Sequence, residues 1–110
     1  MPDSNEEVRD RLAARPVVPI SIPTITADTN LTSRPCLLCG WSLRETTGAA
    51  TAAGEFKAGN DNTNPNVGEQ ALASAGTGSL ALMDEGVLCE GGLRIHVVSG
   101  SLAGVAYVRI

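Results

Sequence analysis

The sequence predicts a small all-β protein: an antiparallel β-sandwich or barrel, jelly-roll-like, with an extended N-terminal arm that carries a short helix. Three observations predict it. Roughly six or seven short stretches have the alternating or β-branched pattern of strands, about ten residues apart. Gly-rich turns separate them, and only one segment has helical features. A chain of 110 residues suffices for one domain with an arm. We expect residues 1–30 to form the arm and residues 31–110 the sandwich.

Residues 5–15 are expected to form the short helix. Ser4 and Glu7 have the spacing of a capping box, in which each side chain accepts a hydrogen bond from the other residue's backbone N–H. The apolar stripe consists of Val8 and Leu12 only. A helix of this length is marginal alone in water, so we expect it to dock on a surface. The alternative is a loose N-terminal tail.

Residues 16–25 are apolar and are interrupted by Pro16, Pro19 and Pro23. Each proline removes a backbone donor, which excludes a central strand and leaves an extended arm or an edge strand. A solvated linker would not need so many β-branched residues, so this stretch should lie against its own domain or a neighbour. The candidate residues for binding the capsid or a neighbouring subunit are therefore Val8, Leu12, Val17, Val18, Ile20, Ile22 and Ile25.

The first clear strand covers residues 36–47. Residues 49–58 form a weaker candidate anchored by Phe56, and the Gly/Asn/Asp/Pro-rich residues 59–66 should form an exposed loop. In the first strand, a strict period of two places four apolar residues on one face, namely Leu37, Cys39, Trp41 and Leu43.

Four further strands are expected over residues 67–73, 79–84, 93–98 and 102–110, with a turn at Asp84–Glu85 after the second of them. The last is apolar on both faces, which is typical of a central strand or of an interface. We therefore expect it to carry self-association, through Val105, Tyr107, Val108 and Ile110.

No catalytic constellation is apparent. Cys36 and Cys39 have the spacing of half a zinc site, but residues three apart on a strand point to opposite faces. The remaining soft ligands, Cys89 and His96, do not form a second such pair. We expect structural cysteines, a surface or interface histidine, no metal or other cofactor, and no enzymatic activity.

The charge pattern argues against other classes of function. Twelve acidic residues oppose eight basic ones, for a net charge of −4, and no basic stripe exists for nucleic acid. No apolar run approaches the roughly 18 residues of a membrane span. Asp3, Glu6 and Glu7 stand where a signal peptide would be basic. We expect synthesis in a cytoplasm, with neither nucleic acid nor membrane as a partner.

Two stretches resemble a known family. They are residues 40–49, Gly-Trp-Ser-Leu-Arg-Glu-Thr-Thr-Gly-Ala, and residues 92–105, Gly-Leu-Arg-Ile-His-Val-Val-Ser-Gly-Ser-Leu-Ala-Gly-Val. They resemble a paired strand and late hairpin in small β-sandwich virion proteins of tailed bacteriophages, especially those of actinobacterial hosts. The resemblance covers about residues 34–106. The chain departs from that pattern in residues 57–66, which lack an aromatic residue, and in the Cys36/Cys39 pair.

The resemblance implies a virion structural protein, foremost a capsid decoration (cement) protein on the capsid exterior, made in the host cytoplasm. Its partners would be the major capsid protein and itself, as a homotrimer, because closed rings leave no open interface. Several arms in one oligomer would strengthen attachment. The alternatives are a tail, neck or head-fibre accessory protein, or a host-surface-binding module.

Overall fold

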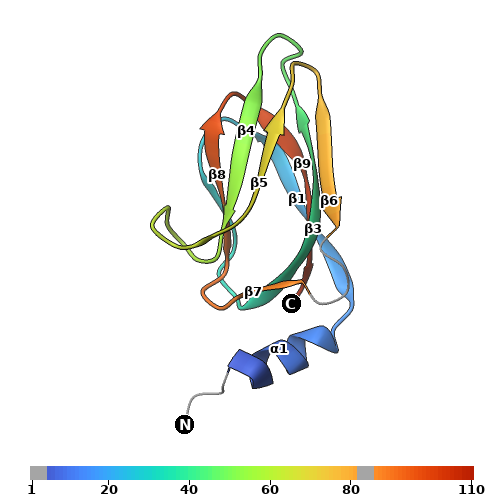
Figure 1. Cartoon of the computed structure of the whole chain (residues 1–110), viewed down its shortest axis with the longest axis vertical. Helices are drawn as coiled ribbons and strands as arrows, with labels where there is room; N and C mark the ends of the chain where they lie inside the picture. Colours follow the sequence, from blue (N-terminus) through green and yellow to red (C-terminus); the bar gives the residue numbers. More distant parts are fainter. Residues whose placement is uncertain (1–4, 82–85) are drawn as a thin grey trace.

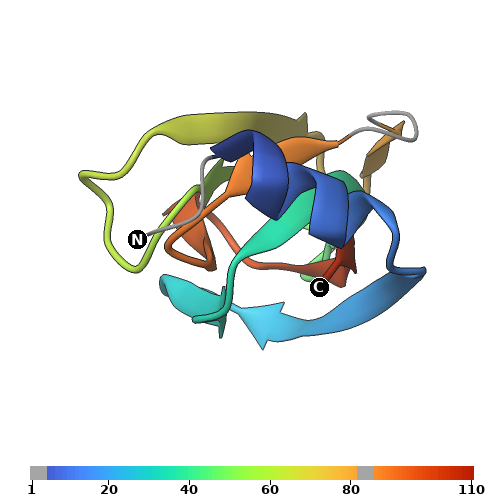
Figure 2. The ribbon, with the colours of Figure 1, turned by 90° about the horizontal axis from the view of Figure 1, so that it is seen from below.

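Two antiparallel sheets pack face to face as a β-sandwich, and one short helix lies across one end of it (Figures 1 and 2). The predicted all-β fold class is confirmed. The computed structural model describes residues 5–81 and 86–110. In chain order the elements are α1 (Asn5–Ala13), β1 (Val17–Ile25), β2 (Thr29–Thr32), β3 (Cys36–Glu45), β4 (Ala52–Lys57), β5 (Asn66–Leu72), β6 (Thr77–Ala81), β7 (Val87–Cys89), β8 (Leu93–Ser99) and β9 (Leu102–Arg109).

The first sheet, here called sheet A, has the strand order β1-β9-β3-β6, and β7 also pairs with β3. The long strand β3 has two partners on one side, because its first residues pair with β7 and its later residues pair with β6. The second sheet, sheet B, has the order β2-β8-β4-β5. Strand β9 lies between β1 and β3, which explains why its sequence is apolar on both faces.

The core lies between the two sheets and contains two of the three aromatic residues. The rings of Trp41 and Phe56 have centroids 4.8 Å apart, and the Trp41 indole N–H donates to Gln70 Oε1 at 3.1 Å. The buried cluster consists of Ile22, Cys36, Leu38, Trp41, Leu43, Ala52, Phe56, Leu72, Cys89, Leu93, Ile95, Leu102, Ala106 and Val108.

The predicted arm is largely part of the sandwich. Residues 17–25 form β1, which pairs along β9 at the edge of sheet A, with Val18 opposite Val108 and Ile20 opposite Ala106. Of the two possibilities that the prolines left open, the structure therefore contains the edge strand. At an edge, missing backbone donors can face the open side at no cost to the ladder. The boundary predicted at residue 30 is wrong, because β1 and β2 already belong to the sheets.

Strand β3 contains a bulge that the sequence pattern did not indicate. Leu38 lies opposite Val108, whereas Gly40 lies opposite Tyr107, so Cys39 is an extra residue. The bulge moves the later residues to the other face, and the core therefore receives Leu38 before it and Trp41 after it. The single shared face predicted for Leu37, Cys39, Trp41 and Leu43 is wrong for this reason.

Helix α1 docks on its own sandwich. It lies against β3 (Figure 2). The guanidinium of Arg109, at the end of β9, donates to the backbone oxygen of Arg15 at 2.5 Å and to that of Ala13 at 3.4 Å. A cation at this position satisfies carbonyls that the end of a helix leaves without partners. Arg9 also donates to the backbone oxygen of Gly86 at 3.4 Å.

Most of the other predicted elements are found. The strands expected from residues 36, 49, 67, 79, 93 and 102 correspond to β3, β4, β5, β6, β8 and β9, with β4 beginning three residues later than expected. Residues 59–65 form a loop. Strands β2 and β7 were not predicted, because four and three residues are too short to show a period. Ser4 of the predicted capping box and the predicted turn at Asp84 and Glu85 lie outside the described residues.

Candidate functional site

Of the two stretches behind the family resemblance, residues 42–45 of the first pair with residues 102–105 of the second. Strands β3 and β9 pair along the run from Gly40 to Glu45. Just beyond, Thr46 donates its backbone N–H to the Ser101 oxygen at 3.2 Å, and the two hydroxyl oxygens lie 2.5 Å apart. Residues 45–48 and 101–102 thus form one unit at the end of the sandwich opposite α1 (Figure 1). The bonds of Thr46 with Ser101 hold two strand ends together, which indicates a structural role.

Glu45 is the buried acid of this unit. Its Oε1 accepts the Thr47 N–H at 2.8 Å and the Thr47 hydroxyl, and its Oε2 accepts the N–H groups of Gly48 at 2.6 Å and Ala75 at 2.9 Å. These donors, the Thr47 hydroxyl foremost, lower the pKa of Glu45 from 4.5 to about 2, although burial raises it. A carboxylate held in this way joins the β3–β4 and β5–β6 loops and does not act as a general acid or base.

A second polar cluster, centred on Asp28, lies on sheet B. Oδ1 of Asp28 lies 2.8 Å from Nδ1 of His96 and accepts the Val97 N–H at 2.8 Å. Its Oδ2 accepts from Asn62 Nδ2 at 2.6 Å and lies 3.4 Å from Nη2 of Arg94. These interactions, the bond from Asn62 foremost, lower the pKa of Asp28 from 3.8 to about 2. Because Asp28 and His96 are 68 positions apart, no local motif could have revealed the cluster.

In the Asp28–His96 pair a carboxylate orients an imidazole, as in the acid and base of a catalytic triad, but no nucleophile accompanies them in the described residues. The second ring nitrogen of His96 lies 3.9 Å from Oε1 of Glu55. Within the described part of the chain, no hydroxyl or thiol is hydrogen-bonded to His96. Arg94 donates to Asn62 Oδ1 at 2.8 Å and to the Asn60 oxygen at 3.4 Å, so the cluster ties the loop after β4 to sheet B.

Most of the arm residues predicted to bind a partner pack against the sandwich of their own chain. Ile22 is 2% exposed and belongs to the core, so it cannot reach a partner. Val18, Ile20 and Ile25 are half-buried and pack against the core, and Val8 and Leu12 are half-buried on α1. Of the seven residues predicted to bind a partner, only Val17 is exposed, at 44%.

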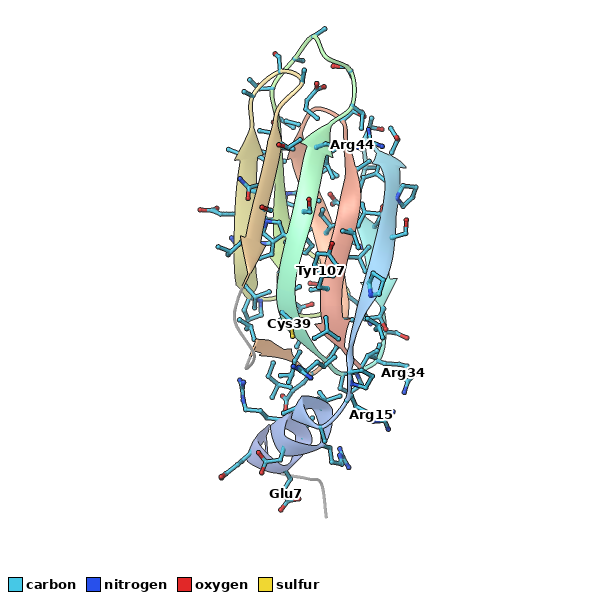
Figure 3. All side chains as sticks on the ribbon, turned by 90° about the vertical axis from the view of Figure 1, so that its right-hand side faces the viewer. Glu7, Arg15, Arg34, Cys39, Arg44 and Tyr107 are labelled. Atoms are coloured by element: carbon cyan, nitrogen blue, oxygen red, sulfur yellow. The ribbon has the colours of Figure 1, made fainter. Side chains whose placement is uncertain are left out.

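The predicted self-association residues are divided between the two faces of β9. Val108 is in the core and Ile110 packs against it, so these two were wrongly assigned to a surface. Tyr107 is 39% exposed and points away from the core (Figure 3). Val105 is half-buried and lies on the same face of β9, because it alternates with the buried Ala106. With the neighbouring residues of β1 they form an apolar surface on sheet A, here called the outer patch, consisting of Val17, Pro19, Val105 and Tyr107.

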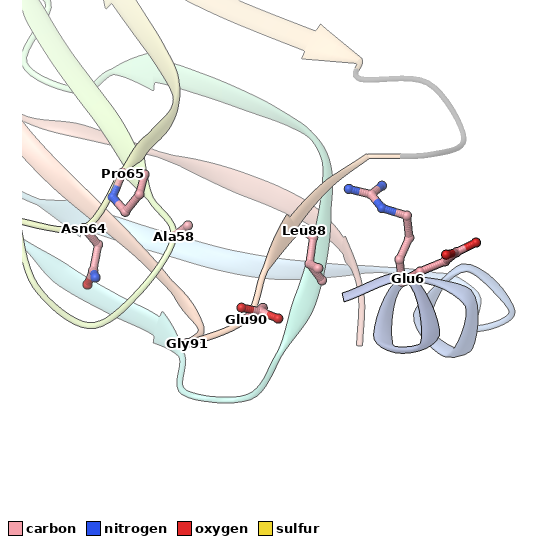
Figure 4. A pocket seen from close by; sticks show the side chains of 8 residues that line it. Glu6, Ala58, Asn64, Pro65, Leu88, Glu90 and Gly91 are labelled. Carbon is pink, nitrogen blue, oxygen red and sulfur yellow. The ribbon is translucent and has the colours of Figure 1, made fainter. Parts of the chain in front are cut away.

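An open groove of about 660 Å³ lies between α1, the loop before β5, and β7 (Figure 4). Its apolar lining comes from Ala58, Pro65 and Leu88, and Glu6 and Glu90 stand on opposite sides of it. These two carboxylates come from separate elements and do not converge on one point. The groove therefore offers a place for a chain segment and lacks the grouped acids and bases of an active site.

A smaller groove of about 290 Å³ beside α1 collects positive charge. Its lining includes Arg11 and Arg15 of the helix region, Arg34, and the apolar residues Leu12 and Pro35. Arg15 and Arg34 lie near each other beside α1 (Figure 3). No sequence pattern indicates this group, because the fold brings together arginines that are separate in the chain. Grouped arginines of this kind suit an acidic partner.

The cysteines do not form a metal site in the described residues. Cys36, Cys39 and Cys89 are all buried and free. Across residues 5–81 and 86–110, no three histidine, cysteine or acidic side chains are grouped so that they could hold a metal ion.

Among the described residues no helix is long and apolar enough to cross a membrane. Comparison of the chain with protein-family models, curated proteins and solved structures found no match.

Proposed function

We propose that the chain is a structural protein of a phage virion, foremost a capsid decoration protein that binds the outside of the major capsid lattice and stabilises the head. The resemblance of residues 40–49 and 92–105 to virion proteins favours this class. The observation that carries the proposal is the outer patch, an exposed apolar surface built on two paired strands.

The outer patch has the character of a docking surface for another protein. It presents Tyr107 together with aliphatic and proline side chains, on strands that hold them in place. Aromatic residues are enriched at protein interfaces, where they bury a large area at low entropic cost. The patch is carried by a sheet and not by a cleft, which suits an extended partner surface better than a small substrate.

Decoration would stabilise the head by mass action. A protein that binds the assembled lattice and not the free subunits shifts the equilibrium toward the assembled shell. The domain is elongated, with extents of 50 × 25 × 17 Å, which gives it the reach to contact more than one capsid subunit. The groove of Arg11, Arg15 and Arg34 would add attraction to an acidic part of the lattice.

The test is binding of the purified protein to phage heads prepared without it. We expect wild type to cosediment with such heads, and Tyr107→Glu to bind at least tenfold more weakly, about 1.4 kcal/mol. Val98→Glu is the matched control, because Val98 is 54% exposed but lies on sheet B. Cosedimentation with purified tails but not heads would support the tail or neck alternative. Binding to neither would overturn the proposal.

A further inference from the structure

We propose that Cys36 and Cys89 are the site of an intramolecular disulfide that joins β3 to β7 when the chain meets an oxidising environment. The two residues are direct partners in the antiparallel pairing of these strands. Directly opposed residues in such a pair have Cα atoms about 4.5–5.5 Å apart, which lies within the range that disulfides span.

The two thiols also share one environment. Both side chains are completely buried and both belong to the core cluster between the sheets, so they point to the same side of sheet A. Strand β7 has three residues, and Cys89 is the last of them. A bond at this position would secure the end of a short edge strand that few other residues hold.

The electrostatics of the pair indicate which sulfur reacts first. A hydrogen bond between the two thiols lowers the pKa of Cys89, although burial raises it, and the same contact raises the pKa of Cys36. The backbone N–H of Leu38 further favours the Cys89 thiolate. Since the thiolate is the attacking species in disulfide exchange, Cys89 is the nucleophile and Cys36 the resolving thiol.

The third cysteine differs in position. Cys39 is the extra residue of the β3 bulge and has no cysteine opposite it, and its thiol points to the backbone oxygen of Leu37 at 3.6 Å. It should therefore remain a free thiol when the other two are oxidised. This difference supplies a matched control within the same strand.

The reaction balances with a small-molecule disulfide as the oxidant. The Cys89 thiolate attacks one sulfur of that molecule and releases its other half as a thiol. The Cys36 thiol then loses its proton and attacks the Cys89 sulfur, releasing the second small thiol. Two protein thiols are oxidised and one small disulfide is reduced to two thiols. Because both cysteines are buried, the oxidant enters when β7 opens locally, so the reaction should be slow.

The experiment incubates the full chain with oxidised glutathione, with and without urea below the unfolding midpoint. We expect the intact mass to fall by about 2 Da, the free thiols to fall from the three cysteines to Cys39 alone, and the peptide map to join residues 36 and 89. The melting temperature should rise by roughly 10 °C.

Three variants make the result specific. Cys39→Ala should lose 2 Da as wild type does, whereas Cys36→Ala and Cys89→Ala should form no intramolecular bond. Their circular dichroism spectra show whether each variant is folded. A bond to Cys39 in the wild-type peptide map, or retention of all thiols by folded wild type and Cys39→Ala in both conditions, would overturn the proposal.

Discussion

Glu45 and Asp28 organise the loops of this protein, each by accepting hydrogen bonds from residues distant in the sequence. Glu45 joins the turn after β3 to Ala75, which is 30 positions away, and Asp28 joins the start of β2 to the loop after β4 and to β8. Buried or half-buried carboxylates of this kind stay charged, because their acceptor positions are filled by donors. Their contribution to stability therefore depends on pH.

The first prediction is acid lability that depends on Glu45. Its pKa is lowered from 4.5 to about 2 in the folded protein. A lowered folded pKa means that the stabilisation is fully present above about pH 5 and is lost as the pH falls through 4.5 toward 2. In urea unfolding from pH 7 to pH 2.5, Glu45→Gln should start from a lower midpoint and change less with pH than wild type. Glu69→Gln, at an exposed site of β5, is the control. If the unfolding midpoints of Glu45→Gln and wild type changed with pH in parallel, the Glu45 carboxylate would not be the source of the acid lability.

The second prediction concerns the packing of Trp41 on Gly68. A Cβ atom built at Gly68 would lie 2.4 Å from the Trp41 ring, so the indole occupies the space that a side chain would need. Gly68→Ala should therefore destabilise the fold by about 1–3 kcal/mol, measured by chemical denaturation. At Gly91 the nearest atom would be 3.5 Å away, and Gly91→Ala should stay within about 0.5 kcal/mol of wild type. Equal effects of the two substitutions would contradict this packing.

At the scale of elements, strands with a regular two-residue alternation could be predicted from the sequence, whereas the position of a bulge within a strand could not. Strands β8 and β9 follow the alternation of their sequences and lie where the pattern indicates. In β3 the bulge at Cys39 changes which residues face the core, and nothing in a two-residue period shows where an extra residue will be accommodated. For residues 17–25 the prolines limited the choice to arm or edge strand, and only pairing with β9, some 85 residues later, decides between them.

The candidate site was predicted less well than the fold. The clusters around Asp28 and Arg34 depend on contacts between segments far apart in the chain, so no spacing reveals them. Tyr107 and Val105 were identified as surface residues because β9 is apolar on both faces, but the same pattern could not show that Val108 points inward.

The third prediction tests whether β1 is a strand of the sandwich. Ile22 is 2% exposed and Val17 is 44% exposed, although both are aliphatic residues of the same strand. Ile22→Ala should cost about 2–5 kcal/mol of unfolding free energy, because it leaves a cavity in the core. Val17→Ala should change stability by less than about 0.5 kcal/mol. A free arm would make both substitutions neutral, so equal and small effects would contradict the pairing with β9.

At the scale of the whole molecule, the two ends and the two sheets differ in character. One end is closed by the Glu45 unit, and the other carries α1 and the groove of Arg11, Arg15 and Arg34. Sheet B carries the Asp28 cluster, whereas sheet A presents the outer patch. This asymmetry would suit a molecule that uses sheet A for contacts with other protein chains and leaves sheet B to solvent.

The fourth prediction is self-association through the outer patch. Sedimentation equilibrium at high micromolar concentration should show a trimer for wild type and mainly monomer for Tyr107→Glu, because a buried, unpaired carboxylate opposes assembly. Val98→Glu should remain a trimer, since Val98 lies on the other sheet. Dissociation by Val98→Glu and not by Tyr107→Glu would move the interface to sheet B, and a wild-type monomer would contradict self-association.

Electron cryomicroscopy of virions with and without this chain tests most directly the proposal that it decorates the outside of a phage head. We predict extra density on the capsid exterior of wild-type particles, at threefold positions, into which three copies of the sandwich fit. Virions made without the chain should lack this density, and their capsids should break open at a lower temperature. Identical heads in both preparations, or a difference confined to the tail, would contradict the account.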